Sequence, residues 1–353
     1  MKKGLVASLV SILFALAGSA IFLNWYYADK LHKRLVGGRW PVNSYRYNER
    51  TSNYEFTPGF SAEMLNKTYY LKIHELGYRI SKDTDSHSFL PGGILSIGCS
   101  FTFGDDENAE DTFTYLAAEM LGVSGYNYGV PSYSYASSIL QLRDLEQQGI
   151  LEKLKPSIIV LGAGGWLIHR SLSPFYPTNI QLGYPYLREG DGSVRVANPP
   201  GIISVKHAIG FATSSSYFDS NGSRRVELNL RRRLMLMNLI PRVLIAKAMQ
   251  RFFENGLSQN DLHRFVLTSI SEIARNNEAR FLTLSMPWYA KNLAVNGILR
   301  NAIEKCGCTS LVDGGKELAT YGALSAKLAH PSREAHLAYA KGIVETFRKF
   351  EEP

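Results

Sequence analysis

Four short, mostly apolar runs recur along the chain, and patterns typical of amphipathic helices separate them. The runs lie at residues 94–97, 158–161, 281–284 and 309–312; the helical patterns lie at residues 111–121, 134–148, 257–276, 293–305 and 332–350. Strands that alternate with helices form βαβ units, whose strands are parallel. We therefore expect a three-layer α/β/α fold with a mainly parallel sheet.

The chain is basic, with a formal net charge of +8 and a pI of about 9.2. The Lys and Arg residues are scattered, and their densest run is Arg231 to Arg233. No zinc-finger spacing or RNA-binding motif accompanies this run, so we expect no nucleic-acid partner. A solvated face, or one near anionic lipid headgroups, is the favoured interpretation.

Three cysteines, Cys99, Cys306 and Cys308, are too few for a disulfide framework and lack the partners of a zinc site. We expect Cys306 and Cys308 to be small residues that close a helix and open a strand. No metal site and no cofactor is expected.

The first 27 residues have the pattern of a membrane anchor. Lys2 and Lys3 precede an apolar run over residues 5–23, which is long enough to cross a bilayer as a helix. Signal-peptide cleavage after Ala17 is the alternative. Because the apolar run continues past Ala17, we expect a retained anchor, with the following domain outside the cytoplasm, on the periplasmic side.

Three regions follow the anchor. Residues 28–90 indicate a loop-rich juxtamembrane segment with one extended stretch at residues 69–73, and residues 91–353 form the main domain. Within that domain, residues 170–241 are rich in Tyr, Pro, Gly and Ser and indicate an insertion over the site. Its aromatic side chains fit either stacking on sugar rings or packing in a core; they include Phe175, Tyr176, Tyr184 and Tyr186.

A small-residue turn, residues 98–104, directly follows the strand at residues 94–97 and precedes a helix. Such a turn can present the Ser100 hydroxyl at the carboxyl end of the sheet, where α/β folds bind ligands. Serine is a weak nucleophile and needs a base from elsewhere in the fold. The alternative is that Ser100 only caps a helix.

Four blocks of sequence carry a resemblance to a known family: ILSIGCSFTFG at residues 94–104, NYGVPSYS at 127–134, PSIIVLG at 156–162 and HPSREAHLAYA at 330–340. In order and spacing they resemble the SGNH (GDSL) hydrolases, over residues 90–350 apart from the insertion. The resemblance implies a flavodoxin-like α/β fold and a serine-dependent esterase.

Residue by residue, the resemblance implies that Ser100 is the nucleophile and His330 its base. The backbone N–H groups of Ser100 and Gly129 would form the oxyanion hole, and Asn127 would brace that turn.

Three positions depart from the family pattern. Cys99 replaces a mainly structural Asp. The third block has no Asn over residues 162–167, where the family has a side-chain donor to the oxyanion. Either the backbone amides of Gly164 or Gly165 substitute for it, or the oxyanion hole is incomplete, which would lower transition-state stabilisation by about 3 kcal/mol. Lys327 stands where the family has an Asp three residues before the histidine.

The missing carboxylate leaves several interpretations open. A Ser–His dyad can function without it, or Asp313 can supply it from the end of the last strand. Asp105, Asp106 and Glu107 form an acidic cluster beside Ser100. We expect that cluster to be solvated at a helix N-terminus rather than to do acid–base work.

The expected function is hydrolysis of an acyl ester, including esters of a polysaccharide or glycan. The first alternative is a polysaccharide O-acyltransferase of the SGNH type, which would share the acyl-enzyme. The second is a catalytically degenerate SGNH fold that acts as a binding or assembly module.

The anchor yields the first testable prediction. Mass spectrometry of the membrane-extracted protein should find residues 1–27 retained, because a helix that is apolar throughout stays in the bilayer. A mature N-terminus at Gly18, together with release from the membrane, would show cleavage instead.

Overall fold

The computed structural model describes residues 44–64, 69–172, 185–190, 193–198, 258–287, 294–321 and 330–350. The expected anchor (residues 1–27) and Lys327 lie outside these ranges. Within them, no helix combines the length and the apolar character needed to cross a membrane.

The core is an eight-stranded sheet with the strand order β12-β11-β8-β6-β7-β5-β4-β3. Its strands are β3 (Ser61–Glu63), β4 (Tyr70–Ile73), β5 (Arg79–Ile80), β6 (Ile94–Ile97), β7 (Gly125–Asn127), β8 (Ile158–Ala163), β11 (Arg280–Ser285) and β12 (Ser310–Asp313). The five strands from β12 to β7 are parallel, and β5, β4 and β3 continue the sheet in antiparallel fashion. Within the parallel part the strand order is 2-1-3-4-5, which agrees with the flavodoxin-like fold that the resemblance implies.

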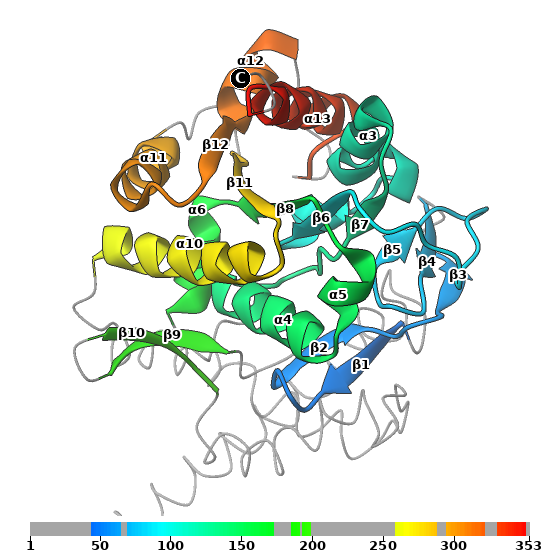
Figure 1. Ribbon diagram of the computed structural model, residues 1–353, viewed down its shortest axis with the longest axis horizontal. Coiled ribbons are helices and arrows are strands. Elements are labelled where there is room, and N and C mark those ends of the chain that lie inside the picture. Colours follow the sequence, from blue (N-terminus) through cyan, green and yellow to red (C-terminus); the bar gives the residue numbers. More distant parts are fainter. Residues whose placement is uncertain are drawn as a thin grey trace, which may run out of the picture.

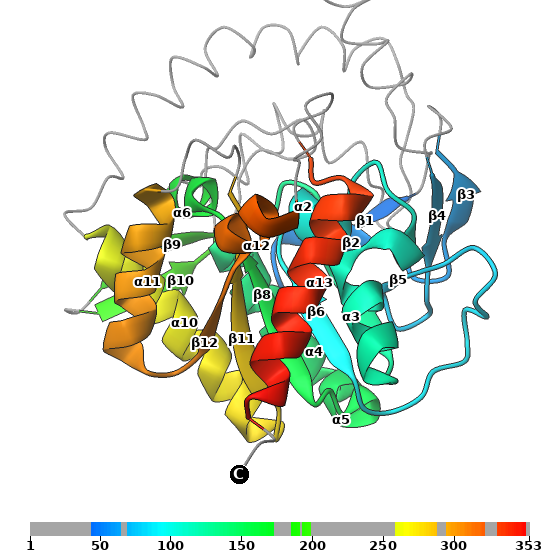
Figure 2. The same ribbon diagram turned by 90° about the horizontal axis from the view of Figure 1, so that it is seen from above.

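Helices cover both faces of the sheet. Helices α3 (Phe113–Leu121), α12 (Gly314–Tyr321) and α13 (Arg333–Arg348) lie on one face, and α4 (Tyr135–Gln147), α5 (Ile150–Leu154) and α10 (Gln259–Asn276) lie on the other (Figure 1). Helix α11 (Ala294–Cys306) flanks the β12 edge, and α13 lies in front of the central strands (Figure 2). The three central parallel strands, β6, β8 and β11, are buried along almost their whole length, which explains why they appear in the sequence as mostly apolar runs.

Residues 44–64 and 69–80 contain more strands than the loop-rich segment we expected, in which only the extended stretch at residues 69–73 was predicted; that stretch is β4 (Tyr70–Ile73). They form the hairpin β1 (Tyr45–Asn48) and β2 (Asn53–Phe56), and they also supply strands β3 to β5 of the main sheet. Most of their buried side chains form a second hydrophobic cluster with Phe103 of the turn at residues 98–104. Apart from β4, these strands are two to four residues long and their alternation is too brief to stand out from the sequence.

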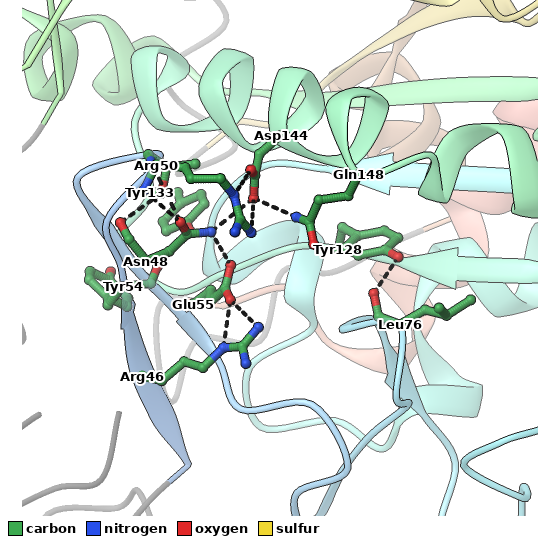
Figure 3. A network of polar contacts seen from close by, with 11 residues as sticks. Arg46, Asn48, Arg50, Tyr54, Glu55, Leu76, Tyr128, Tyr133, Asp144 and Gln148 are labelled. Carbon is green, nitrogen blue, oxygen red and sulfur yellow. Dashed lines mark hydrogen bonds and ion pairs between the residues drawn. The ribbon is translucent and has the colours of Figure 1, made fainter. Parts of the chain in front are cut away.

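A buried carboxylate ties the β1–β2 hairpin to the main domain. In Figure 3, Asp144 of α4 accepts hydrogen bonds from Asn48, Arg50 and Gln148. Asn48 donates a second bond to Glu55, so the hairpin and the helix share one polar network. The Asp144 side chain is only 6% exposed, whereas that of Arg50 is 54% exposed.

The two paired cysteines differ from our expectation. Cys306 ends α11 and Cys308 precedes β12, as predicted, but the two form a disulfide. Gly307 between them has a φ of +58°, a turn that folds the two side chains toward each other. Cys99 is buried and has a free thiol.

Residues 170–172 of the expected insertion lie at the end of a helix, and its other described residues contain a hairpin, β9 (Tyr186–Gly190) with β10 (Ser193–Ala197). Tyr186 is 3% exposed and packs in the interior, so its ring is not available to stack on a sugar. Phe175, Tyr176 and Tyr184 lie outside the described residues.

The polar network of Figure 3 yields a stability prediction. Asp144→Ala should lower the free energy of unfolding by about 2–3 kcal/mol, because it leaves buried donors without their acceptor. Arg50→Ala, at the exposed end of the same ion pair, should cost less than about 1 kcal/mol. Urea unfolding of the two variants checks this, and equal losses would contradict the assigned role of Asp144.

Candidate active site

Ser100 begins a one-turn helix, α2 (Ser100–Phe103), directly after the central strand β6. Strands β7 and β8 pair with the two sides of β6, so the turn lies at the topological switch point of the parallel sheet. The first amide bonded within the turn is that of Phe103, which donates to the Cys99 carbonyl at 2.9 Å. The amides of Ser100 and Phe101 therefore precede the helical hydrogen bonds, where helices interact with anionic groups.

The structure brings Ser100 and His330 together across 230 positions of sequence. His330 Nε2 lies 3.1 Å from Ser100 Oγ, within hydrogen-bond distance. His330 precedes α13, whose N-terminus is capped by the Ser332 side chain, and the edge of its ring contacts Phe101. With its side chain only 20% exposed, the imidazole is held beside the serine.

Two carboxylates from the turn after α2 flank this imidazole. Asp106 Oδ2 lies 3.6 Å from His330 Nδ1, and Asp105 Oδ2 lies 3.8 Å from His330 Nε2. Their side chains are only 12% and 6% exposed, respectively. Our expectation that this acidic cluster is solvated is therefore wrong for Asp105 and Asp106, because the turn directs both side chains inward.

Asp313, which we considered as a source of the missing carboxylate, ends β12 and is engaged with other groups. It accepts hydrogen bonds from the Arg300 side chain at 2.5 Å and from the Lys316 amide at 3.2 Å. The carboxylates that the structure places beside His330 come instead from the turn that follows the serine.

A buried cation holds that turn in place. The Arg79 guanidinium on β5 donates to the carbonyls of Phe103 (2.6 Å), Gly104 (3.0 Å) and Glu107 (2.5 Å). It also lies over the rings of Tyr69 and Phe103. Burial lowers the pKa of Arg79, and the nearby Tyr69 and Asp105 oppose that shift. We did not single out Arg79 from the sequence; the only signal is a charged residue between Tyr78 and Ile80.

Asn127 braces the same turn from β7. Its Nδ2 donates to the carbonyls of Thr102 (3.0 Å) and Phe103 (3.3 Å), and its Oδ1 accepts the Gly129 amide at 3.0 Å. This differs from the expected role of Gly129, because its N–H is directed to Asn127 rather than toward an oxyanion. Glycine is required here for another reason: a Cβ would lie 2.3 Å from the Phe103 nitrogen.

Gly164 and Gly165, at the family's Asn position, open helix α6 (Gly165–Ser171). A Cβ on Gly164 would lie 2.5 Å from the Trp166 ring, so the indole occupies the space that a larger side chain would need. Trp166 in turn packs on Phe101, with ring centroids 4.7 Å apart. An aromatic pair therefore stands beside the serine where the family has a polar side chain.

His336 is fully buried and is part of the structural support. Its Nδ1 accepts the amide of Phe113, the first residue of α3, at 3.2 Å. Burial, followed by Arg79 and His330, lowers the pKa of His336 to about 3. The ring therefore stays neutral and acts as a helix cap supplied from a distant helix.

No family model and no curated protein matches the sequence. Among solved structures, the chain is similar to TesA (12% identity, 73% of this chain and 98% of the other, TM-score 0.39). It is also similar to a member of the lipolytic protein G-D-S-L family from Veillonella parvula DSM 2008, with 11% identity over 73% of this chain and 99% of the other and a TM-score of 0.36.

A third similar structure is a carbohydrate esterase family 2 enzyme plus carbohydrate-binding domain from Corynascus thermopiles (Myceliophthora fergusii), with 12% identity, 77% of this chain, 69% of the other and a TM-score of 0.36. The described residues form a mixed α/β fold with a large, mostly parallel sheet.

The buried His336 yields a pH prediction. Its folded pKa of about 3 lies below its ordinary value of 6.5, so on acidification the unfolded chain binds the proton first. Its contribution to stability is complete above about pH 6.5 and is lost as the pH falls toward 3.

Between pH 7.5 and pH 5 the protein should therefore lose about 2 kcal/mol that His336→Gln does not lose. Chemical denaturation of both proteins at the two pH values checks this. Equal losses would show that His336 is not held neutral in the folded state.

Proposed function

We propose that this chain is a serine-dependent hydrolase of acyl esters, with Ser100 as nucleophile and His330 as general base. The observation that carries the proposal is the 3.1 Å contact between Ser100 Oγ and His330 Nε2 at the switch point of a parallel sheet. A serine within reach of an imidazole, with carboxylates beside the ring, is the arrangement that activates a hydroxyl for acyl transfer.

In the proposed reaction, Ser100 Oγ attacks the ester carbonyl carbon as its proton moves to His330 Nε2. The tetrahedral intermediate collapses, the carbon–oxygen bond to the alcohol breaks, and His330 returns the proton to the departing alcohol. Water then attacks the acyl-enzyme with the same base, which releases the acid and restores Ser100.

The developing oxyanion would be held by the Ser100 amide at the start of α2. Gly129 is a weaker candidate for a second donor, because its amide already bonds to Asn127. Gly164 and Gly165 carry no side-chain donor, and Trp166 fills the space beside Gly164. The hole is therefore expected to be less complete than in the family that the chain resembles, which favours esters with good leaving groups.

We also propose that the domain acts outside the cytoplasm, tethered by residues 1–27. The Cys306–Cys308 disulfide supports an oxidising compartment, where such bonds persist. Acyl esters of extracytoplasmic polysaccharides are the substrates we propose to test first. Release of free acid would indicate a hydrolase, and acylation of an added glycan would indicate a transferase.

Ser100→Ala tests the proposed chemistry. The variant should fold normally and lose at least about 10³-fold in kcat/KM on p-nitrophenyl esters and acetylated glycans, because no other group replaces the nucleophile. Wild type should form a covalent fluorophosphonate adduct that peptide mass spectrometry maps to Ser100, and the exposed-site control Ser88→Ala should behave as wild type.

A folded Ser100→Ala protein with full activity would overturn the assignment of the nucleophile. If wild type gives neither an adduct nor turnover, the chain is a binding or assembly module on the same fold.

A further inference from the structure

We infer that Asp106 is the carboxylate that positions His330, in place of the family's Asp near the end of the chain. This inference rests on the proposed function and adds a residue to it. It places the nucleophile and the group that orients its base on a single turn, residues 100–106.

The two nitrogens of His330 face different partners. Nε2 faces Ser100 Oγ at 3.1 Å, whereas Nδ1 faces Asp106 Oδ2 at 3.6 Å. A base that takes the Ser100 proton at Nε2 must carry its own hydrogen on Nδ1. The carboxylate that faces Nδ1 is therefore the one able to select this tautomer.

His330 Nδ1 also needs an acceptor. It is buried from solvent and has no hydrogen-bond partner among the described residues. A distance of 3.6 Å is longer than a hydrogen bond, but catalytic hydrogen bonds are commonly long without substrate and shorten in the reactive complex. Asp106 would accept this bond throughout the reaction without taking the proton, so the charge on its carboxylate stabilises the transient imidazolium.

The backbone at Asp106 supports a role for its side chain. Asp106 has a φ of +81°, in the left-handed region that glycine adopts freely and other residues adopt at a cost. The turn is held on both sides, because Arg79 bonds the carbonyls of Phe103, Gly104 and Glu107. A side chain at a position that favours glycine, aimed at the imidazole, indicates that the carboxylate itself is what the position requires.

Asp105 is less suited to this role. Its Oδ2 faces Nε2, the same nitrogen that faces Ser100, and its Oδ1 accepts the Tyr69 hydroxyl at 2.9 Å. It also opposes the lowered pKa of the buried Arg79. Asp105 therefore fits the role of counter-charge to Arg79, whereas Asp106 faces the nitrogen that sets the tautomer.

Asp106→Asn and Asp106→Gly together test the inference. Both should reduce kcat, and the rate of Ser100 labelling by diisopropyl fluorophosphate, by at least about 10²-fold with KM nearly unchanged, because the imidazole loses its orientation. Glu107→Gln removes one charge from the adjacent residue and should stay within about twofold of wild type.

Two further readouts separate positioning from a structural role. Asp106→Gly should raise the melting temperature while it lowers kcat, because glycine relieves the backbone strain that Asp106 carries. In Asp106→Asn, the pH profile of kcat/KM should change relative to wild type, because the carboxylate that faces His330 Nδ1 is replaced by a neutral amide. Asp105 remains 3.8 Å from His330 Nε2, and burial keeps the pKa of His336 low in both proteins.

The outcomes also separate this inference from the proposed function. If Ser100→Ala is inactive while both Asp106 variants keep near-normal kcat and an unmoved pH profile, the esterase proposal stands and the role of Asp106 is overturned. If Ser100→Ala keeps full activity, the esterase proposal itself fails.

Discussion

One buried cation supports the geometry of the site. The Arg79 guanidinium lies in the interior between β5 and the turn that follows Ser100, where it bonds three backbone carbonyls. Burial of a cation is costly, and here the carbonyls, two aromatic faces and the nearby Asp105 offset that cost. The Phe103 carbonyl also accepts from Asn127, and the Gly104 carbonyl also accepts from the Glu107 amide. Arg79 therefore adds a charged donor to a turn whose carbonyls are already partly bonded, and these bonds together fix its shape.

The residues of the site come from two separate segments of the chain. Ser100, Asp105 and Asp106 belong to a single turn that Arg79 and Asn127 hold in place. His330 arrives separately, on the residues that lead into α13. If Asp106 orients His330, the turn that carries Ser100 also sets the orientation of the imidazole. The alignment of His330 with Ser100 then depends on how α13 packs against the domain, and less on the residues immediately before His330.

Four of the five parallel strands and the main helices could be predicted from the sequence, because burial leaves mostly apolar runs. Strand β7 could not, since it is only three residues long. Strand β4 matches the extended stretch predicted at residues 69–73. Strands β1, β2, β3 and β5 could not be predicted, since each is short and is stabilised by pairing and packing far along the chain. Ser100 and His330 could be proposed as site residues because the sequence blocks around them resemble those of a known family. Asp106 could not, because its direction depends on a positive φ that the residue type does not signal. The resemblance implies that the Gly129 amide donates to an oxyanion, whereas the structure requires glycine there because a Cβ would contact the backbone of α2.

The second hydrophobic cluster has a consequence for where this domain begins. The stretch that resembles a known family starts near residue 90, but Phe103 packs against side chains that include Tyr54, Phe56 and Leu71. Arg79 also lies before that boundary. A chain trimmed to the blocks that carry the resemblance would expose the Phe103 side chain and would lack Arg79, which bonds the turn that follows Ser100. The folding unit therefore extends at least as far back as the first hairpin, and the resemblance of short sequence blocks is a poor guide to its limits.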